Sequence, residues 1–531
     1  MDWNDLLVTA RTMRRAGIVM PHGPRRLLRA RTAAEHWGLN YAGGFASAGA
    51  LHADQPCVVD ERGQRTWGEV DAASDAMANG LRARGIGEGD VVAVLCRNHR
   101  WFVIATAGLA KLGADILFLN TSFAGPQLRE VVAREDAKAL IYDEEYAELV
   151  ATDGDVGLKL VAWHDGDPPP GTESLDLLIA RAPHSRPPAP RRAGRSIILT
   201  SGTTGTPKGA PRDQETGIEP IVAMLDRIPY RARETMVVPA PLFHSWGFGN
   251  RSLSLLLGTT LVVRRRFDPE ATLRDVARHR AQVLVAVPVM LQRILELPEH
   301  VRRRYDTSSL RVVPLSGSAI PGGLATRWMD EFGDNLYNLY GSTEVGWATI
   351  ATPEDLRADP ATAGRPPLHT RVELLDEHDR PVAQGETGRI FVGSELTFDG
   401  YTGGGDKARV GELVSTGDTG FFDGAGRLHV VGRDDEMIVS GGENVFPREV
   451  EDCIAEHPDV VEVAVIGVPD DEFGQRLKAF VVLGADATLD EAAVKALVKA
   501  TLAGYKVPRD VVFLDELPRN PTGKVLKREL T

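Results

Sequence analysis

Residues 90–120 read DVVAVLCRNHRWFVIATAGLAKLGADILFLN, and this stretch decides the fold class. Residues 91–95 are a short run rich in valine, residues 98–112 have the length and composition of a helix, and residues 116–119 are apolar again. A strand, a helix and a second strand in this order predict a βαβ unit, whose two strands lie parallel in one sheet.

The rest of the chain extends this α/β pattern and then departs from it. Segments that look helical separate several further short apolar runs, which lie at residues 139–142, 197–199, 236–238, 261–263, 283–287 and 310–315. Residues 183–190 (PHSRPPAP) read as an extended connector. Residues 372–392 read as strand, turn and strand, which predicts a β-rich subdomain at about 365–432.

The last part of the chain predicts a separate small domain. Residues 433–531 contain expected strands at 460–468 and 478–482 and an expected helix at 489–502, enough for a small α+β domain. We therefore expect a large N-terminal domain over residues 1–432, built of α/β subdomains and the β-rich subdomain, and a C-terminal domain over 433–531.

The composition of the chain argues against some classes of function. The 531 residues include 61 Lys and Arg against 74 Asp and Glu, a net charge of −13, which argues against a nucleic-acid-binding protein. Three cysteines give no disulfide framework and suit the cytoplasm, and no run approaches the ~20 apolar residues that span a bilayer. Residues 11–31 are basic with apolar residues among them; a solvated helical arm is favoured there, and a peripheral membrane contact is the alternative. No oligomeric state is predicted.

A phosphate-binding loop is expected at residues 201–209, which read SGTTGTPKG directly after the apolar run 197–199. Glycines let successive backbone amides face inward, while hydroxyl groups and Lys208 add further donors, so the loop suits a polyphosphate. It is not a Walker loop, because Pro207, Lys208 and Gly209 stand where that pattern needs Gly, Lys and Ser or Thr.

Five further segments follow in order: YGSTE (340–344), STGD (415–418), GRDDE (432–436), SGGENVFPREVE (440–451) and PRNPTGKVLKREL (518–530). With the loop at 201–209, they resemble the signatures of the adenylate-forming superfamily, which contains acyl- and aryl-CoA synthetases, adenylation domains of peptide synthetases and beetle luciferases. The resemblance runs from about Thr66 to Leu530. It implies a large N-terminal domain hinged to a small mobile one, and the reaction of a carboxylic acid with ATP to an acyl-adenylate and pyrophosphate.

The resemblance assigns an ATP and AMP site. Lys208 and the loop hydroxyls would hold the β- and γ-phosphates, Asp418 would accept from both ribose hydroxyls, and Tyr340 would offer its ring to adenine. The complete expected set is Thr200, Ser201, Gly202, Thr203, Thr204, Gly205, Lys208, Gly317, Ser318, Ala319, Tyr340, Gly341 and Asp418.

The same resemblance assigns catalytic groups that offset the repulsion between a carboxylate and a triphosphate. Glu344 would be the protein ligand of Mg²⁺, Thr343 would donate to the α-phosphate, and Arg433 would bridge ribose and phosphate. Lys524 would bridge the carboxylate and the α-phosphate during adenylation.

A second conformation is implied for the thioester-forming step. Asp435 is the expected hinge, about which the C-terminal domain would rotate after the adenylate forms. Gly441 and Gly442 would then line the tunnel for CoA, because two adjacent glycines permit close backbone approach.

The acid site is expected around residues 241–249, PLFHSWGFG. His244 stands where peptide-synthetase domains typically carry an aspartate, which disfavours a free α-amino acid and places the histidine near the substrate carboxylate. Trp246, Phe248 and Trp347 are expected to line the acyl pocket. Residues 338–353 look most like bacterial fatty-acyl-CoA synthetases, so a medium- or long-chain fatty acid is favoured and an aromatic acid comes second.

The acceptor of the acyl group is expected to be CoA, since the sequence ends shortly after Lys524 without a carrier domain. A fatty acyl-AMP ligase that loads a separate carrier protein is the alternative enzyme. A member that only binds nucleotide or acyl-adenylate is the alternative of another class. Against it, all five expected key residues are present: Lys208, Glu344, Asp418, Arg433 and Lys524.

Overall fold

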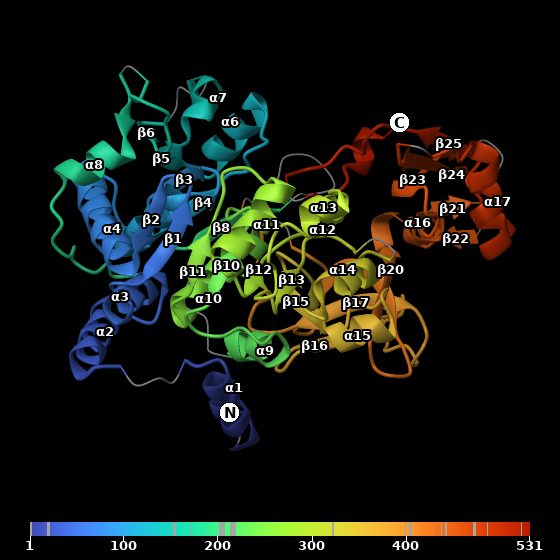
Figure 1. Ribbon diagram of the computed structural model, residues 1–531, viewed down its shortest axis with the longest axis horizontal. Coiled ribbons are helices and arrows are strands. Elements are labelled where there is room, and N and C mark those ends of the chain that lie inside the picture. The colour runs from blue at the N-terminus through green and yellow to red at the C-terminus, as the bar shows by residue number, and fades with distance from the viewer. Residues whose placement is uncertain are drawn as a thin grey trace. The chain divides into compact units, whose positions relative to one another are not determined.

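The computed structural model describes residues 3–18, 22–151, 156–169, 171–200, 208–212, 219–320, 323–398, 400–402, 406–436, 438–440, 443–470, 474–485, 487–521 and 523–530 (Figure 1). The chain forms two compact units. Unit 1 comprises Met1–Ala286, Leu297–Pro314 and Glu395–Asp406; unit 2 comprises Val287–Glu296, Leu315–Ser394 and Lys407–Thr531.

A seven-stranded sheet in unit 1 contains the predicted βαβ unit, in which α5 (Arg100–Leu112) joins parallel strands β3 and β4. All neighbouring strands pair in parallel except β8 and β9, which form a hairpin around the expected phosphate loop. The strand order is β7 (Glu173–Ser174), β6 (Leu158–Val161), β5 (Ala137–Tyr142), β3 (Val91–Leu95), β4 (Asp115–Phe118), β8 (Ser196–Thr200) and β9 (Lys208–Arg212).

A second sheet of unit 1 has five strands, of which only β2 runs antiparallel to its neighbour. Their order is β12 (Val283–Leu284), β10 (Thr235–Val237), β11 (Thr260–Val262), β1 (Pro56–Asp60) and β2 (Gly63–Thr66). The apolar runs expected at 139–142 and 197–199 thus fall on strands, and those at 236–238 and 261–263 overlap strands that end one residue earlier, as continuous apolar runs do in buried parallel sheets.

Helices complete unit 1. Twelve of the thirteen residues of α5 are buried, so this helix lies in the core and packs against α4 and α3. The others are α1 (Trp3–Arg15), α2 (Pro24–Trp37), α3 (Tyr41–Leu51), α4 (Trp67–Arg82), α6 (Gly125–Arg134), η1 (Glu144–Tyr146), α7 (Ala147–Ala151), α8 (Leu175–Arg181), α9 (Glu219–Arg227), α10 (Ser245–Leu257), α11 (Pro269–Arg278) and α13 (Glu299–Arg302).

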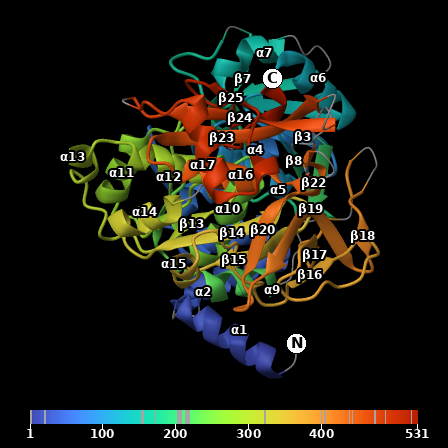
Figure 2. The same cartoon turned by 90° about the vertical axis from the view of Figure 1, so that its right-hand side faces the viewer.

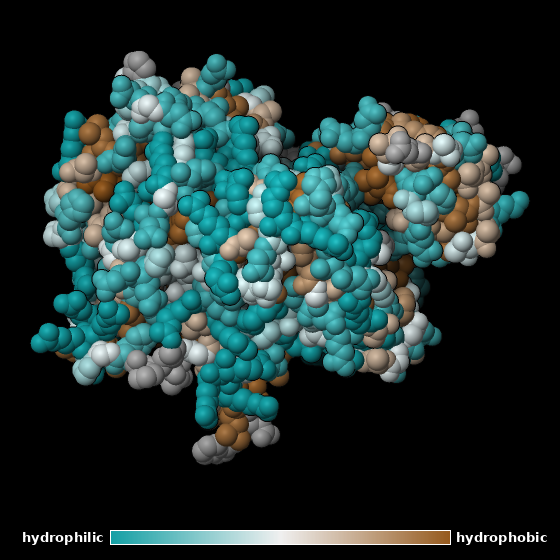
Figure 3. Space-filling model, in the orientation of Figure 1, coloured by the Kyte–Doolittle hydropathy of each residue, from teal (hydrophilic) through white to brown (hydrophobic). Residues whose placement is uncertain are grey.

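The basic N-terminal stretch falls largely on helices α1 and α2. Hydrophobic and hydrophilic side chains lie together on the surface of α1 (Figure 3). Leu6, Leu7, Leu27 and Leu28 are all exposed on these two helices. No helix in the described ranges is both long and apolar enough to cross a membrane.

Unit 2 contains the predicted β-rich region. Strand β16 (Arg371–Leu375) pairs antiparallel with β17 (Gly388–Gly393), as the pattern at 372–392 predicts. β19 (Leu413–Phe422) pairs with β17, with β18 (Arg409–Val410) and with β20 (Leu428–Arg433). A separate hairpin consists of β14 (Leu336–Ser342) and β15 (Gly346–Ala351). Helices α12 (Pro288–Leu295), α14 (Leu324–Phe332) and α15 (Pro353–Ala358) also belong to unit 2. The chain first enters this unit at Val287 and re-enters it within β13 (Val313–Leu315).

The C-terminal part of unit 2 is a small α+β arrangement, seen face-on in Figure 2. Strands expected at 460–468 and 478–482 are β23 (Val460–Asp470) and β24 (Gly474–Leu483), and the expected helix is α17 (Glu491–Thr501). Its other elements are η2 (Asp434–Glu436), β21 (Ile438–Ser440), β22 (Glu443–Val445), α16 (Pro447–Ala455), η3 (Gly504–Lys506), β25 (Asp510–Phe513) and η4 (Lys527–Glu529). The mixed α/β fold is confirmed; the domain boundary between 432 and 433 stays a prediction.

Candidate active site

Two of the expected nucleotide-binding residues, Tyr340 and Asp418, lie together with the expected catalytic Arg433 in unit 2. The Tyr340 hydroxyl, near the end of β14, donates to Oδ2 of Asp418 at 2.5 Å, and its oxygen lies 3.3 Å from Oγ1 of Thr416. Asp418 stands opposite Arg433 in the β19–β20 ladder, and Nη1 of Arg433 lies 3.9 Å from its Oδ1. Two strand pairs therefore bring an aromatic ring, a carboxylate and a guanidinium to one place.

The electrostatics of this cluster are those of a shielded carboxylate. Burial raises the pKa of Asp418, while the Tyr340 hydrogen bond and the positive charges of Arg433, Lys524 and Lys407 counteract part of that rise. Burial, and then the Asp418 charge, raise the pKa of Tyr340 well above its ordinary value. The tyrosine therefore stays a hydrogen-bond donor at neutral pH, and its ring is held in one orientation.

Thr343 and Glu344 lie in the turn between β14 and β15, and Glu344 is only 8% exposed. Gly341 makes this hairpin possible, because a Cβ there would lie 2.1 Å from the Gly346 carbonyl oxygen. Trp347, expected in the acyl pocket, is directly opposite Gly341 on β15. A buried carboxylate beside a hydroxyl group offers the hard oxygen ligands that Mg²⁺ prefers, so the residues present fit this ion.

The remaining described residues that were predicted in unit 2 lie in two loops and in one 3₁₀ helix. Gly317, Ser318 and Ala319 follow β13, and Gly317 has a positive φ of 97°, which favours glycine. Lys524 has an exposed side chain in a turn where its backbone N–H donates to Oδ1 of Asn520 at 2.9 Å. Asp435 lies in η2. Gly441 and Gly442 lie outside the described residues.

In unit 1, the expected phosphate loop connects β8 and β9, and Thr200 pairs with Lys208 across this hairpin. Ser201, Gly202, Thr203, Thr204 and Gly205 lie outside the described residues.

Residues 400–402 contact β9, the strand that follows the loop. The Lys208 ammonium lies 5.3 Å from the centre of the Tyr401 ring, and the Thr402 N–H donates to the Gly209 carbonyl at 2.8 Å. The sequence analysis did not single out Tyr401, because nothing in its local sequence links it to a loop almost 200 residues away.

The expected acid-binding segment leads into α10, with His244 as its N-cap residue. Nε2 of His244 is shielded from solvent and has no hydrogen-bond partner among the described residues. Burial lowers the pKa of His244 to about 4, so the ring is neutral at pH 7. Trp246 is buried and its indole N–H donates to the Ala286 carbonyl at 3.0 Å, whereas Phe248 is half-buried.

Asn98, which the sequence analysis did not identify, fixes the segment before His244. Its Nδ2 donates to the carbonyls of Val238 at 3.2 Å and Ala240 at 2.9 Å, and its Oδ1 accepts from the Leu242 N–H at 2.8 Å. Asn98 is 4% exposed, so water cannot readily replace these bonds. One buried amide therefore joins the loop after β3 to the backbone that carries His244.

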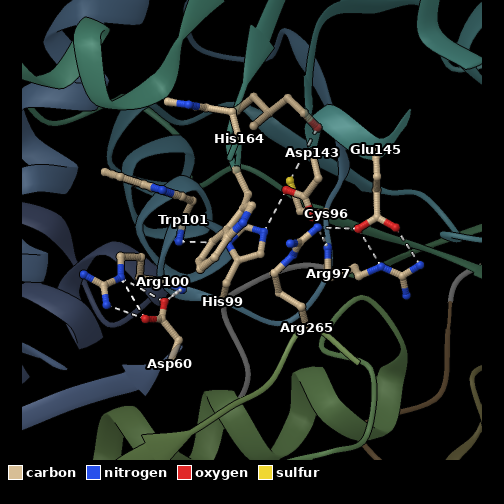
Figure 4. Close-up of polar contacts among 12 residues, drawn as sticks. Asp60, Cys96, Arg97, His99, Arg100, Trp101, Asp143, Glu145, His164 and Arg265 are labelled. Carbon is tan, nitrogen blue, oxygen red and sulfur yellow. Dashed lines mark hydrogen bonds and ion pairs between the residues drawn. The ribbon is translucent and has the colours of Figure 1, made fainter. Parts of the chain in front are cut away.

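A buried pair of side chains holds the Asn98 loop in turn (Figure 4). Nε2 of His99 lies 2.7 Å from Oδ1 of Asp143, whose Oδ2 accepts from the Arg97 N–H at 2.8 Å. The backbone N–H of Trp101 donates to Nδ1 of His99 at 3.2 Å. Because Nδ1 accepts this hydrogen bond, the proton of the neutral ring lies on Nε2, which donates a hydrogen bond to Asp143.

Cys96 completes this group, and the possible ligand atoms of Cys96, His99 and Asp143 all lie within 4.8 Å of one another. Both ring nitrogens of His99 are engaged in hydrogen bonds. Burial raises the pKa of the Cys96 thiol well above its ordinary value. A protonated thiol and a histidine without a free lone pair make a structural hydrogen-bonded cluster and a poor metal site.

The chain matches known proteins over nearly its whole length. The family model described as AMP-binding enzyme matches residues 45–402, and that described as AMP-binding enzyme C-terminal domain matches residues 449–524. An indoleacetate–CoA ligase of Aromatoleum aromaticum is 32% identical, over 88% of this chain and 92% of that protein. A long-chain-fatty-acid–CoA ligase of Mycobacterium tuberculosis is 30% identical, over the same shares.

A solved structure agrees with these matches. The anthranilate CoA ligase AuaEII, in complex with anthranoyl-AMP, superimposes with a TM-score of 0.85 at 26% identity, over 94% of this chain and 98% of that one. The fold is thus that of the adenylate-forming class. The chain belongs to the AMP-binding enzyme family, and within it to the AMP-forming acid–thiol ligases.

Proposed function

We propose that this enzyme activates a largely apolar carboxylic acid with ATP and transfers the acyl group to CoA. The observation that carries the proposal is the partly buried Asp418 carboxylate, held between the Tyr340 hydroxyl and the Arg433 guanidinium. A carboxylate with free acceptor sites beside a cation and an aromatic ring suits a ribose, a phosphate and an adenine base.

Each protein group has one task in the first half-reaction. Lys208 holds the outer phosphates, Thr343 donates to the α-phosphate, and Glu344 holds Mg²⁺, which offsets phosphate charge when bound. Lys524 places its ammonium between the substrate carboxylate and the α-phosphate. These fixed charges lower the barrier for one carboxylate oxygen to attack the α-phosphorus while pyrophosphate leaves.

In the second half-reaction the thiol of CoA attacks the acyl carbon and AMP leaves. The proposal includes rotation of residues 433–531 about Asp435 between the two steps, with Gly441 and Gly442 beside the incoming thiol. The mobile part would withdraw Lys524 once the repulsion it offsets has gone.

The acid is expected beside His244, Trp246, Phe248 and Trp347. A neutral His244 with a shielded, unpartnered Nε2 can hydrogen-bond a carboxyl or adenylate oxygen without adding charge. A medium- or long-chain fatty acid fits an apolar pocket, and the relative from M. tuberculosis is named for such an acid.

An aromatic acid is the second candidate. It is favoured by relatives named for indoleacetate and anthranilate and by the rings around Phe248, which stacks on Tyr41 with centroids 5.3 Å apart. A panel of fatty and aromatic acids, scored by pyrophosphate release and then by thioester formation with CoA, separates the two. Pyrophosphate release without CoA consumption would favour a carrier-protein acceptor, and nucleotide binding without pyrophosphate release would favour a non-catalytic member.

The N-terminal helices support a peripheral membrane contact as a further part of the proposal. Exposed Leu7 and Leu28 stand near exposed Arg11, Arg14 and Arg29, a composition suited to an anionic surface. Sedimentation with phosphatidylcholine vesicles, with and without phosphatidylglycerol, tests it; equal recovery in the supernatant in both cases would leave the helices a solvated arm.

A further inference from the structure

A stripe of three side chains runs along one face of α10 from its N-terminus. His244 is the N-cap residue, Phe248 follows one turn later and Arg251 two turns later. Residues seven apart in an α-helix lie on the same face and about 10 Å apart along its axis. The two ends of the stripe share one unusual property: each carries shielded nitrogen atoms without a hydrogen-bond partner among the described residues.

Arg251 is a fully buried cation, with 1% of its surface exposed. Its Nη1 donates to Oγ1 of Thr106 at 2.9 Å, but Nε and Nη2 have no partner in the described part of the chain. Three rings surround the guanidinium: its central carbon lies 4.7 Å from the centre of Tyr41, 5.5 Å from Phe45 and 5.0 Å from Phe248.

The rings stabilise the charge but leave the donors unused. Cation–π contacts each contribute about 0.5–2 kcal/mol, whereas a buried N–H group without an acceptor costs about 1–3 kcal/mol, and more when it is charged. Two such N–H groups on one side chain cost considerable folding free energy, because Arg251 has no paired carboxylate among the residues that the structure describes. A guanidinium stays protonated in proteins, so loss of the proton does not relieve the cost.

We propose that Arg251 is the specificity residue for the distal end of the acid substrate, and that the substrate carries an oxygen acceptor there. The inference rests on the proposed function, in which the carboxyl group lies beside His244. The acceptor is a carbonyl, hydroxyl or carboxylate oxygen, which takes a hydrogen bond from Nε or Nη2 while the rest of the acid passes Phe248.

The geometry bounds the substrate. Side chains on a helix lean toward its N-terminus, and the guanidinium accordingly lies over Phe248. The carboxyl group and the acceptor are therefore separated by less than about 10 Å, the helical rise between His244 and Arg251. Oxygenated aryl or medium-chain acids fit these bounds, and an unmodified alkyl chain would leave the two donors unsatisfied.

Two matched pairs of acids test this class directly. The ketone of 7-oxooctanoate becomes a CH–CH₃ group in 7-methyloctanoate, and the acetyl group of 3-(4-acetylphenyl)propanoate becomes isopropyl in 3-(4-isopropylphenyl)propanoate. The two acids of each pair have nearly the same size and shape and differ only in whether they carry the acceptor oxygen. We expect the wild-type enzyme to favour the ketone by roughly tenfold or more in kcat/KM for pyrophosphate release in at least one pair.

Arg251→Met should abolish or reverse that preference, because an apolar side chain then meets the acceptor. Arg251→Lys keeps the positive charge but loses the planar set of N–H donors of the guanidinium, so this variant should retain part of the preference for the ketone. A purely structural role would change the melting temperature of both variants and leave the ratio within each pair unchanged.

The inference is overturned if the wild-type enzyme prefers the hydrocarbon in both pairs. It is also overturned if the ratio of kcat/KM within each pair is the same in Arg251→Met as in the wild type. A third contradicting result is that the enzyme activates other acids but none of these four. Any of these results leaves acid activation itself intact. Absence of pyrophosphate release with every acid tried would instead remove the proposed function, and this inference with it.

Discussion

The Tyr340 hydroxyl donates to Oδ2 of Asp418 at 2.5 Å, across 78 residues of sequence. This bond fixes the tyrosine ring and occupies one acceptor site of the carboxylate expected to bind ribose. Tyr340 therefore has two tasks, to offer its ring and to position Asp418, and the second is evident only from the structure.

Tyr340→Phe should raise KM for ATP several-fold while KM for the acid changes little. The ring is kept, but the partly buried Asp418 loses a hydrogen bond that lowers its pKa, a loss of about 1–3 kcal/mol. Steady-state kinetics of pyrophosphate release measure both constants. Tyr305→Phe, which removes a hydroxyl bond to Glu270 away from this cluster, is the matched control; an equal effect in both variants would argue against the positioning role.

Lys524→Ala should slow adenylate formation about 10³-fold, equivalent to ~4 kcal/mol of transition-state stabilisation. Thiolysis of chemically made acyl-AMP by CoA should stay within a few-fold of the wild-type rate, since the repulsion that Lys524 offsets exists only before pyrophosphate leaves. Lys499→Ala, at an exposed lysine of α17, should affect neither step. Equal defects in both half-reactions would show that Lys524 is not specific to the first.

Asn98→Leu should raise KM for the acid and lower kcat, with a smaller effect on KM for ATP. The substitution leaves two carbonyls and one N–H of residues 238–242 without partners, so the backbone before His244 should shift. Asn79 also donates to two carbonyls, those of Pro183 and Ser185, at the surface of unit 1. Asn79→Leu should lower stability alone, and matching KM changes in the two variants would contradict a role for Asn98 in the acid site.

Stability should fall as the pH is lowered from about 6.5 to about 4. Burial, with the neighbouring charges of His22, Arg233 and Arg26, lowers the pKa of His52 to about 4, and burial does the same for His244. In this window the unfolded chain binds protons that the folded chain does not, so acid favours unfolding. His52→Gln should reduce the drop in melting temperature between pH 7 and pH 5, whereas a variant at exposed His300 should match the wild type. An unchanged drop in His52→Gln would show that His52 is not buried as a neutral ring.

The sequence predicted those parts of the molecule that depend on neighbouring residues. The βαβ unit at β3, α5 and β4 was recognisable because its apolar runs are continuous, and the β16–β17 pair because a turn separates two alternating strands. Residues whose role depends on distant partners could not be found in this way. Asn98 acts across more than 140 residues, and the burial of Arg251 depends on Tyr41, Phe45 and Thr106 from two other helices. An arginine in α10 carries no local sign that it is enclosed.

The fate of one oxygen atom tests acid activation through an adenylate most directly. The acid that gives the highest rate of pyrophosphate release is labelled with ¹⁸O in both carboxyl oxygens and incubated with ATP, Mg²⁺ and CoA, and the AMP is examined by mass spectrometry. If a carboxylate oxygen attacks the α-phosphorus and the thiol then displaces AMP from the acyl carbon, each AMP carries one ¹⁸O atom. Unlabelled AMP formed together with acyl-CoA, or ADP and phosphate in place of AMP and pyrophosphate, would contradict the acyl-adenylate route.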